Sequence, residues 1–178
     1  MSVYVALLRG VNVGNNMLRM ERLRELCKEM RLKNARTYVQ SGNLVFEGDK
    51  DAEHWCGALE RRLAGETRLP VTVIVRTVAE IGKVLAANPF LKEKAIDTSK
   101  LHVTFLRQAP EKDAIEGLRK VKAGPDRFHW IEKEIYLDCP DGYGRTKLSN
   151  LAIEKVLGLR ATTRNWNTVN KLYEMCGT

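Results

Sequence analysis

The order in which strand-like and helix-like patterns follow one another constrains the fold of this chain most. A short apolar run bounded by polar residues is typical of a strand buried on both faces, and residues 3–8 have this form. Apolar residues at helical spacing over residues 20–30 predict an amphipathic helix. The first part of the chain then has the order β-α-β-β-α-β. Its patterns lie at residues 3–8 (strand), 20–30 (helix), 36–40 and 44–47 (strands), 52–63 (helix) and 71–76 (strand).

This order predicts an α+β fold of ferredoxin-like type, in which two helices cover one face of a four-stranded antiparallel sheet. A connecting helix over residues 77–87 ends before Asn88, because the residue before a proline resists helical backbone angles. The second half repeats the pattern, but residues 160–165 stand in place of a fourth strand. We therefore predict two ferredoxin-like (βαββαβ-type) units, the second incomplete and ending in helices. The expected parts are a first unit at 1–76, a connecting helix and linker at 77–100, and a second unit with C-terminal helices at 101–178.

The composition fits a globular protein that needs no disulfide bonds. The 178 residues, of which 44% are hydrophobic, are enough to build a core. Four scattered cysteines without a CxxC pair predict free thiols: Cys27, Cys56, Cys139 and Cys176. No window approaches the ~18 apolar residues of a membrane span, and the run at residues 3–8 is too short for a signal peptide. We expect a cytoplasmic monomer or homodimer with no membrane partner.

The positive charge is concentrated in two segments. The chain has 30 Lys and Arg against 22 Asp and Glu, a net charge of +8. Residues 1–36 carry eight basic and three acidic residues, and residues 145–171 carry six basic and one acidic residue, so each segment has a net charge of +5. The rest of the chain is slightly acidic. This distribution predicts an anionic partner, either a polyanion or an anionic small molecule.

The first candidate binding group lies at one edge of the first predicted sheet. The first and second strands of a βαββαβ sheet run in the same direction, so the loops that follow them share an edge. The alternative is that the Asn and Gly residues there serve only turns. Residues 9–14 contain no GxGxxG or GxxxxGK[ST] fingerprint, so no nucleotide motif is present. The candidate ligand-binding residues at this edge are Arg9, Asn12, Asn16, Gln40, Ser41 and Asn43.

The second candidate group is the loop at residues 141–148, which is predicted to enter a helix with Thr146 as N-cap. Free backbone N–H groups at a helix start favour a phosphate or carboxylate, and Tyr143, Arg145 and Lys147 lie beside it. An ordinary capped helix explains the same residues equally well.

The third candidate group surrounds the start of the last predicted helix. Its candidate ligand-binding residues are Arg164, Asn165, Asn167 and Lys171. Thr163, Asn165 or Asn167 can cap this helix, and Trp166 is better explained by packing than by stacking on a ligand. Arg164 is expected to be exposed, so that its replacement costs little stability.

The sequence offers little for metal or nucleophilic chemistry. The three histidines lack ligand spacing, so no metal and no cofactor are predicted. Ser41 lies in a hairpin rather than in a GxSxG elbow. Cys139 precedes Pro140 near the basic loop, where an arginine would lower its pKa, but a structural cysteine is the favoured interpretation. Residues 3–8 match the first-strand motif of RNA-recognition modules, whereas residues 41–46 lack the partner motif.

Three stretches carry a resemblance to a known family: residues 7–14 (LLRGVNVG), 37–46 (TYVQSGNLVF) and 162–172 (TTRNWNTVNKL), with GRTKL at 144–148 between them. Over nearly its whole length the chain resembles the bacterial family of domain of unknown function 1697. The resemblance implies a pair of ferredoxin-like α/β units. It carries no established activity and no catalytic residues.

Two hypotheses of function follow, from different classes. The first is a non-enzymatic binding protein for an anionic ligand, with single-stranded nucleic acid as the leading candidate because of the net charge. The second is an enzyme acting on a phosphorylated or carboxylated small molecule in a cleft between the two units, where Arg9, Lys147 and Arg164 clamp the anion. It lacks a general base. A homodimer whose basic surface has no chemical role is a third alternative.

Overall fold

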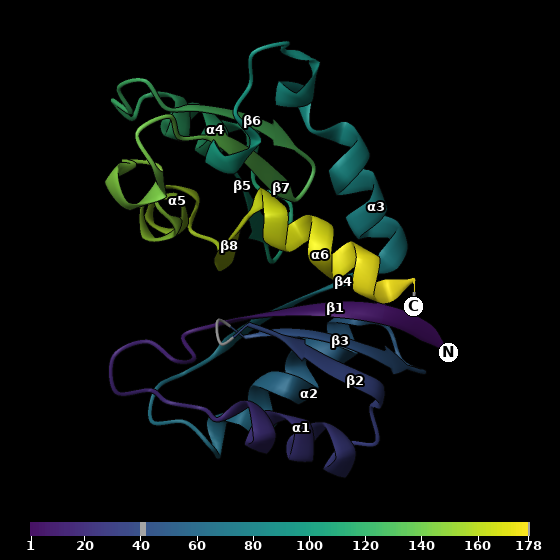
Figure 1. The fold of residues 1–178 in the computed structure, drawn as a ribbon. Coiled ribbons are helices and arrows are strands. Elements are labelled where there is room, and N and C mark those ends of the chain that lie inside the picture. The colour runs from purple at the N-terminus through teal and green to yellow at the C-terminus, as the bar shows by residue number, and fades with distance from the viewer. Residues whose placement is uncertain (40–41, 178) are drawn as a thin grey trace. The chain divides into compact units, whose positions relative to one another are not determined.

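The computed structural model describes residues 1–39 and 42–177 (Figure 1). The chain divides into two compact α+β units. The first comprises residues 1–83 together with the C-terminal segment from Lys171, and the second comprises Val84–Asn170. Each unit contains one four-stranded sheet. Independent domains with the boundaries 1–76 and 101–178 stay a prediction.

The first unit has the predicted order of strands and helices. Its sheet has the strand order β2-β3-β1-β4, and all neighbouring strands are antiparallel. The ends of the elements differ from the expected ones by a few residues. The elements are β1 (Ser2–Arg9), α1 (Met20–Glu29), β2 (Lys33–Tyr38), β3 (Asn43–Gly48), α2 (Ala52–Ala64) and β4 (Thr72–Thr77).

Strand β1 is buried on both faces, as its unbroken apolar run predicted. Tyr4, Ala6 and Leu8 point into a core that also contains buried residues of α1 and α2. The alternate residues Val5 and Leu7 are likewise fully buried. Successive side chains of a strand point to opposite faces, so β1 is buried on both of its faces.

Two helices carry the chain across the boundaries of the units. Helix α3 (Val78–Ala87) contains the first boundary, at Lys83, and α6 (Trp166–Cys176) contains the second, after Asn170. The C-terminal part of α6 belongs to the first unit, where the Arg36 guanidinium donates to the carbonyl of Met175. A cation is stabilising near the C-terminal end of a helix, because the backbone carbonyl groups point toward that end.

The second unit repeats this architecture. Its strand order is β6-β7-β5-β8, again with antiparallel neighbours. Its elements are the 3-10 helices η1 (Pro89–Lys92), η2 (Thr98–Lys100) and η3 (Tyr143–Arg145), the strands β5 (Leu101–Leu106), β6 (Arg127–Ile131), β7 (Glu134–Asp138) and β8 (Ala161–Asn165), and the helices α4 (Lys112–Arg119) and α5 (Asn150–Leu157).

The predicted incompleteness of the second unit is wrong, because β8 is a fourth strand. It pairs antiparallel with β5, and the hydroxyls of Thr104 and Thr163 lie 2.7 Å apart across the pair. The β-branched Thr162 and Thr163 suit an extended backbone. The strand escaped detection because its polar side chains hide the apolar alternation by which strands are recognised.

The segment between α3 and β5 packs on the second sheet. Phe90 is fully buried, and the centre of its ring lies 4.9 Å from that of His129 in β6. Arg127 bridges Glu93 at 2.9 Å and Asp138 at 2.7 Å. The residues expected as a linker therefore form part of this unit's structure. None of the helices in the described residues has the length and apolar character needed to cross a lipid bilayer.

Candidate functional site

The predicted edge of the first sheet forms as expected in the described residues. The backbone N–H of Leu8, near the end of β1, donates to the carbonyl of Gly42 at 2.7 Å. Gly42 has a φ of +81°, and a Cβ there would lie 2.6 Å from Val11 Cγ2. The site therefore requires glycine, both for its backbone angle and for the close approach of the loop. Gln40 and Ser41 lie outside the described residues.

The three candidate asparagines of this edge use their side chains within the first unit. Asn16 donates to the Gly10 carbonyl at 2.5 Å and accepts from the Arg68 N–H at 3.0 Å. Asn12 accepts from the Leu18 N–H, and Asn43 donates to the Tyr38 carbonyl. Arg9 is half-buried at the end of β1. These contacts confirm a structural role for the asparagines, and contact with a ligand stays a prediction.

The predicted helix start at Thr146 is wrong. Helix α5 begins at Asn150, and its N-cap is Ser149, whose hydroxyl accepts from the Ala152 N–H at 3.3 Å. The Thr146 hydroxyl instead accepts from the Leu148 N–H at 3.0 Å, which holds the chain in a local turn. Arg145 and Lys147 therefore precede the helix, and its free N–H groups are not beside them.

Tyr143 is held in the second unit by both ends of its side chain. Its hydroxyl accepts from the Asn150 N–H at 2.8 Å, and its ring stacks on His102 with the centroids 4.8 Å apart. Burial lowers the pKa of His102 below its ordinary value. His102 is therefore neutral near pH 7.

Arg164 is half-buried, in contrast to the expected exposed arginine. Its guanidinium donates to the Thr162 hydroxyl at 2.8 Å and to the Thr163 carbonyl at 2.9 Å. Burial lowers its pKa to about 10. Sequence spacing gave no sign of this, because β8 itself was missed.

The start of α6 has the cap and the packing expected there. Asn165 accepts from the Thr168 N–H at 2.8 Å and so caps the helix. Trp166 is buried, which confirms the packing interpretation. Asn167 is exposed, and Lys171 pairs with Glu174 at 3.2 Å. The composite site predicted from all three groups stays a prediction.

Several arginines are neutralised by carboxylates. Arg22 contacts Glu66 at 2.7 Å and Glu29 at 3.0 Å, and Arg62 contacts the same two glutamates. The hydrogen bonds from these arginines hold the pKa of both glutamates below the ordinary value. Much of the charge on the first helix is thus used to tie α1 to the end of α2.

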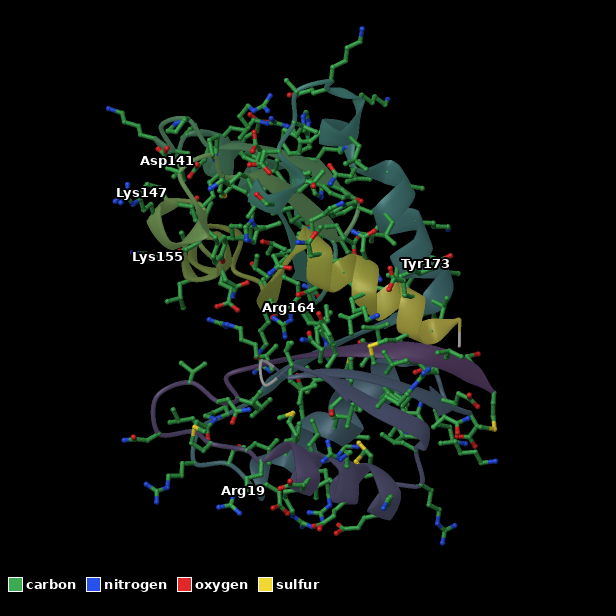
Figure 2. All side chains as sticks on the ribbon, viewed as in Figure 1. Arg19, Asp141, Lys147, Lys155, Arg164 and Tyr173 are labelled. Carbon is green, nitrogen blue, oxygen red and sulfur yellow. The ribbon has the colours of Figure 1, made fainter. Side chains whose placement is uncertain are left out.

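A set of basic residues in the second unit differs from these arginines. Its members are exposed, and within residues 1–39 and 42–177 their side chains make no hydrogen bond or ion pair. In Figure 2, Lys147 and Lys155 project from the same side of this unit. Five residues of this kind come from two segments, 119–122 and 145–155, and we give them the name basic face: Lys120, Lys122, Arg145, Lys147 and Lys155.

An open pocket of about 400 Å³ borders the basic face. Arg119, Val121 and Ala123 line the pocket, and Lys120 and Lys122 lie between them in the sequence. Leu148, which follows Lys147 in the sequence, also lines it. The lining further includes Asp126, Arg127 and Phe128. The guanidinium of Arg119 lies 5.5 Å from the centre of the Phe128 ring.

Sequence reasoning missed this pocket and the two lysines beside it. They lie in the part of the chain that is slightly acidic when its charge is summed. The run Arg119-Lys-Val-Lys122 is nevertheless locally basic, and a charge count over a short window would have found it.

The cysteine thiols supply no reactive nucleophile beside the loop at residues 141–148. All four cysteines are free, as predicted, and Cys139 is buried. Burial raises the pKa of the Cys139 thiol to about 11, so the thiol stays protonated near pH 7. In the described part of the chain no group of three or more His, Cys, Asp or Glu residues is placed to hold a metal ion.

Comparisons with known proteins agree with this architecture. The sequence model of the family described as "Protein of unknown function (DUF1697)" matches residues 1–136. The chain is similar in structure to the conserved bacterial protein SP0830 from Streptococcus pneumoniae, with a TM-score of 0.82 and 20% sequence identity. That match covers 100% of this chain and 99% of the other, and at this identity it shows the fold alone. No functionally curated protein matches the sequence.

Proposed function

The chain belongs to the DUF1697 family, whose function is unknown, and we propose that it is a binding protein for single-stranded nucleic acid, which it contacts through the basic face. The observation that carries the proposal is that these five cations are exposed and lack carboxylate partners among the described residues. The charge of a paired arginine such as Arg127 is neutralised by its ion pairs with Glu93 and Asp138. An unpaired cation is available to a phosphate.

Phosphate contacts supply most of the affinity in binding without sequence preference, because each contact releases a condensed counterion. Lysines on short loops or on the exposed side of a helix suit this purpose, since the strands and helices of the unit fix their positions. A flexible single strand can follow such a face more readily than a rigid duplex.

We further propose that each unit is ferredoxin-like. The strand orders β2-β3-β1-β4 and β6-β7-β5-β8 support this, as does a helix after the first and third strand of each sheet. RNA-recognition modules bind RNA on the open face of a four-stranded sheet. In the first unit Val5 and Leu7 on that face are buried, so we propose contact through the basic face instead, whose residues lie in loops, in η3 and in α5.

The test is a titration of a fluorescein-labelled single strand of about ten uridines at about 50 mM salt. The double variant Arg145→Gln/Lys147→Gln is compared with the unmodified protein. Each lost phosphate contact is expected to weaken binding severalfold at this salt concentration, so the double variant should bind at least about tenfold more weakly.

The matched control is Lys28→Gln/Lys33→Gln in the first unit. Both lysines are exposed, and the net charge changes by the same amount. The control should bind nearly as well as the unmodified protein. Equal weakening by both double variants would show that only net charge matters, and undetectable binding by the unmodified protein would refute the proposal outright.

A further inference from the structure

We infer that the pocket beside the basic face binds a guanine base of the single strand. This inference rests on the proposed function, because the strand must first be held by its phosphates. The pocket then supplies what the lysines lack, which is a means of distinguishing one base from another.

The central observation is the carboxylate of Asp126. It lines the pocket and is half-exposed, and within the described chain it accepts no hydrogen bond and forms no ion pair. Its neighbour Arg127 is committed to Glu93 and Asp138. The available carboxylate of Asp126 disfavours a phosphate beside it, so a ligand group that contacts Asp126 should be uncharged and should present hydrogen-bond donors, while the lining arginines contact other parts of the ligand.

The pocket also offers a planar surface. The Arg119 guanidinium lies over the Phe128 ring, and Val121 and Leu148 add apolar contact. A guanidinium plane stacks on nucleobases as it does on aromatic rings. The ion pair of Arg119 with Glu116, at 3.1 Å, is exposed on both sides and holds the guanidinium only weakly.

Guanine fits a carboxylate best among the bases. Its Watson–Crick edge carries two adjacent N–H donors, which match the two oxygens of a carboxylate. Adenine and cytosine present one amino group beside a ring acceptor, and uracil presents one N–H between two carbonyls. These acceptors are repelled by the carboxylate of Asp126. Lys120, Lys122 and Lys147 stand beside the lining residues in the chain, where they can hold the flanking phosphates.

The experiment compares the uridine strand with the same strand carrying one central guanosine, and with one carrying a central adenosine. The unmodified protein is expected to bind the guanosine strand about tenfold more tightly than either of the others. Asp126→Asn should bring the three affinities together, while binding of the uridine strand stays equal or becomes tighter because a negative charge is lost.

Asp113→Asn is the matched control, since Asp113 is an exposed acid on α4. It removes the same charge and should keep the guanosine preference. Asp126→Glu retains the charge but displaces the carboxylate, and it replaces the asparagine variant if that protein does not fold. Thermal unfolding of each variant reports folding separately.

The possible results separate this inference from the proposed function. Equal affinity of the unmodified protein for all three strands overturns the guanine site and leaves nucleic-acid binding intact. A preference for guanosine that survives in Asp126→Asn also overturns it. If no strand binds, the proposed function fails, and a titration with GMP and AMP then tests the pocket alone. Tighter binding of GMP supports the pocket, and equal or absent binding refutes it.

Discussion

At the scale of single residues, Asn16 connects three parts of the first unit through one buried side chain. It is 1% exposed and contacts the Gly10 carbonyl and the Arg68 N–H. Asn16→Ala leaves these groups without partners, and the free energy of unfolding should fall by about 2–3 kcal/mol. Urea denaturation measures this change. The adjacent Asn15 is exposed, so Asn15→Ala should cost less than about 0.5 kcal/mol. Similar losses in the two variants would contradict the role given to Asn16.

Arg164 and Arg145 form a second matched pair. Arg164→Glu removes the hydrogen bonds to Thr162 and Thr163 and places a carboxylate in a half-buried position, so we expect a loss of about 2–3 kcal/mol. Arg145→Glu changes the same charge at an exposed site and should cost less than about 0.5 kcal/mol. Urea denaturation of both variants checks this. Exposed ion pairs contribute about 0–1 kcal/mol. A loss of less than about 1 kcal/mol for Arg164→Glu would therefore indicate an exposed arginine.

The sequence identified the polar residues of the site but could not assign their partners. Asn16 was recognised as a candidate because polar groups follow a buried strand. Its actual contact at Arg68 is 52 residues away in the chain, and no local pattern contains it. Asp126 was missed for a related reason, since an available carboxylate is recognised only when its neighbours are known to be paired elsewhere.

At the scale of elements, Arg22 joins α1 to the end of α2. It donates to Glu66, and this hydrogen bond is the main cause of the lowered pKa of that carboxyl. A folded-state pKa below the ordinary 4.5 means that the stabilisation is complete above pH 4.5 and is lost as the pH falls through the folded value. Arg22→Gln should therefore lower the Tm at pH 7, and its difference from the unmodified protein should shrink well below pH 4.5.

Arg24→Gln provides the comparison for this pH series. Arg24 lies on the same helix and donates to the Thr37 hydroxyl, which does not titrate in this range. Its effect on the Tm should not depend on pH. A pH-independent effect of Arg22→Gln as well would show that the contact with Glu66 does not stabilise the folded state.

Elements with a clear apolar pattern, either periodic or unbroken, were predicted, and β8, which has neither, was not. Helix α2 lies where the spacing of its apolar residues placed it. Strand β8 was missed because it has only one fully apolar residue, Ala161, and depends on pairing with β5. The start of α5 was placed at Thr146 because a threonine and a serine three residues apart are equally good caps in sequence.

At the scale of the whole molecule, the repeated pattern predicted two α+β units, because each half has its own buried strand. The assignment of the C-terminal segment to the first unit could not be predicted. It depends on contacts such as Arg36 with Met175, between residues 139 positions apart.

The last prediction is the dependence of binding on salt, which follows from the number of cations that contact phosphate. If the five cations of the basic face each contact one phosphate, log K should fall with log salt with a slope of about −3.5 for a single strand. The affinity for the uridine strand should then fall about 100-fold between about 50 mM and about 200 mM salt. Anisotropy titrations at several salt concentrations measure the slope, and Lys155→Gln should reduce its magnitude by about 0.7. The number of counterions released depends on the cations that contact phosphate and not on the net charge. If Lys155→Gln leaves the slope unchanged and Lys28→Gln reduces it, binding is assigned to the first unit.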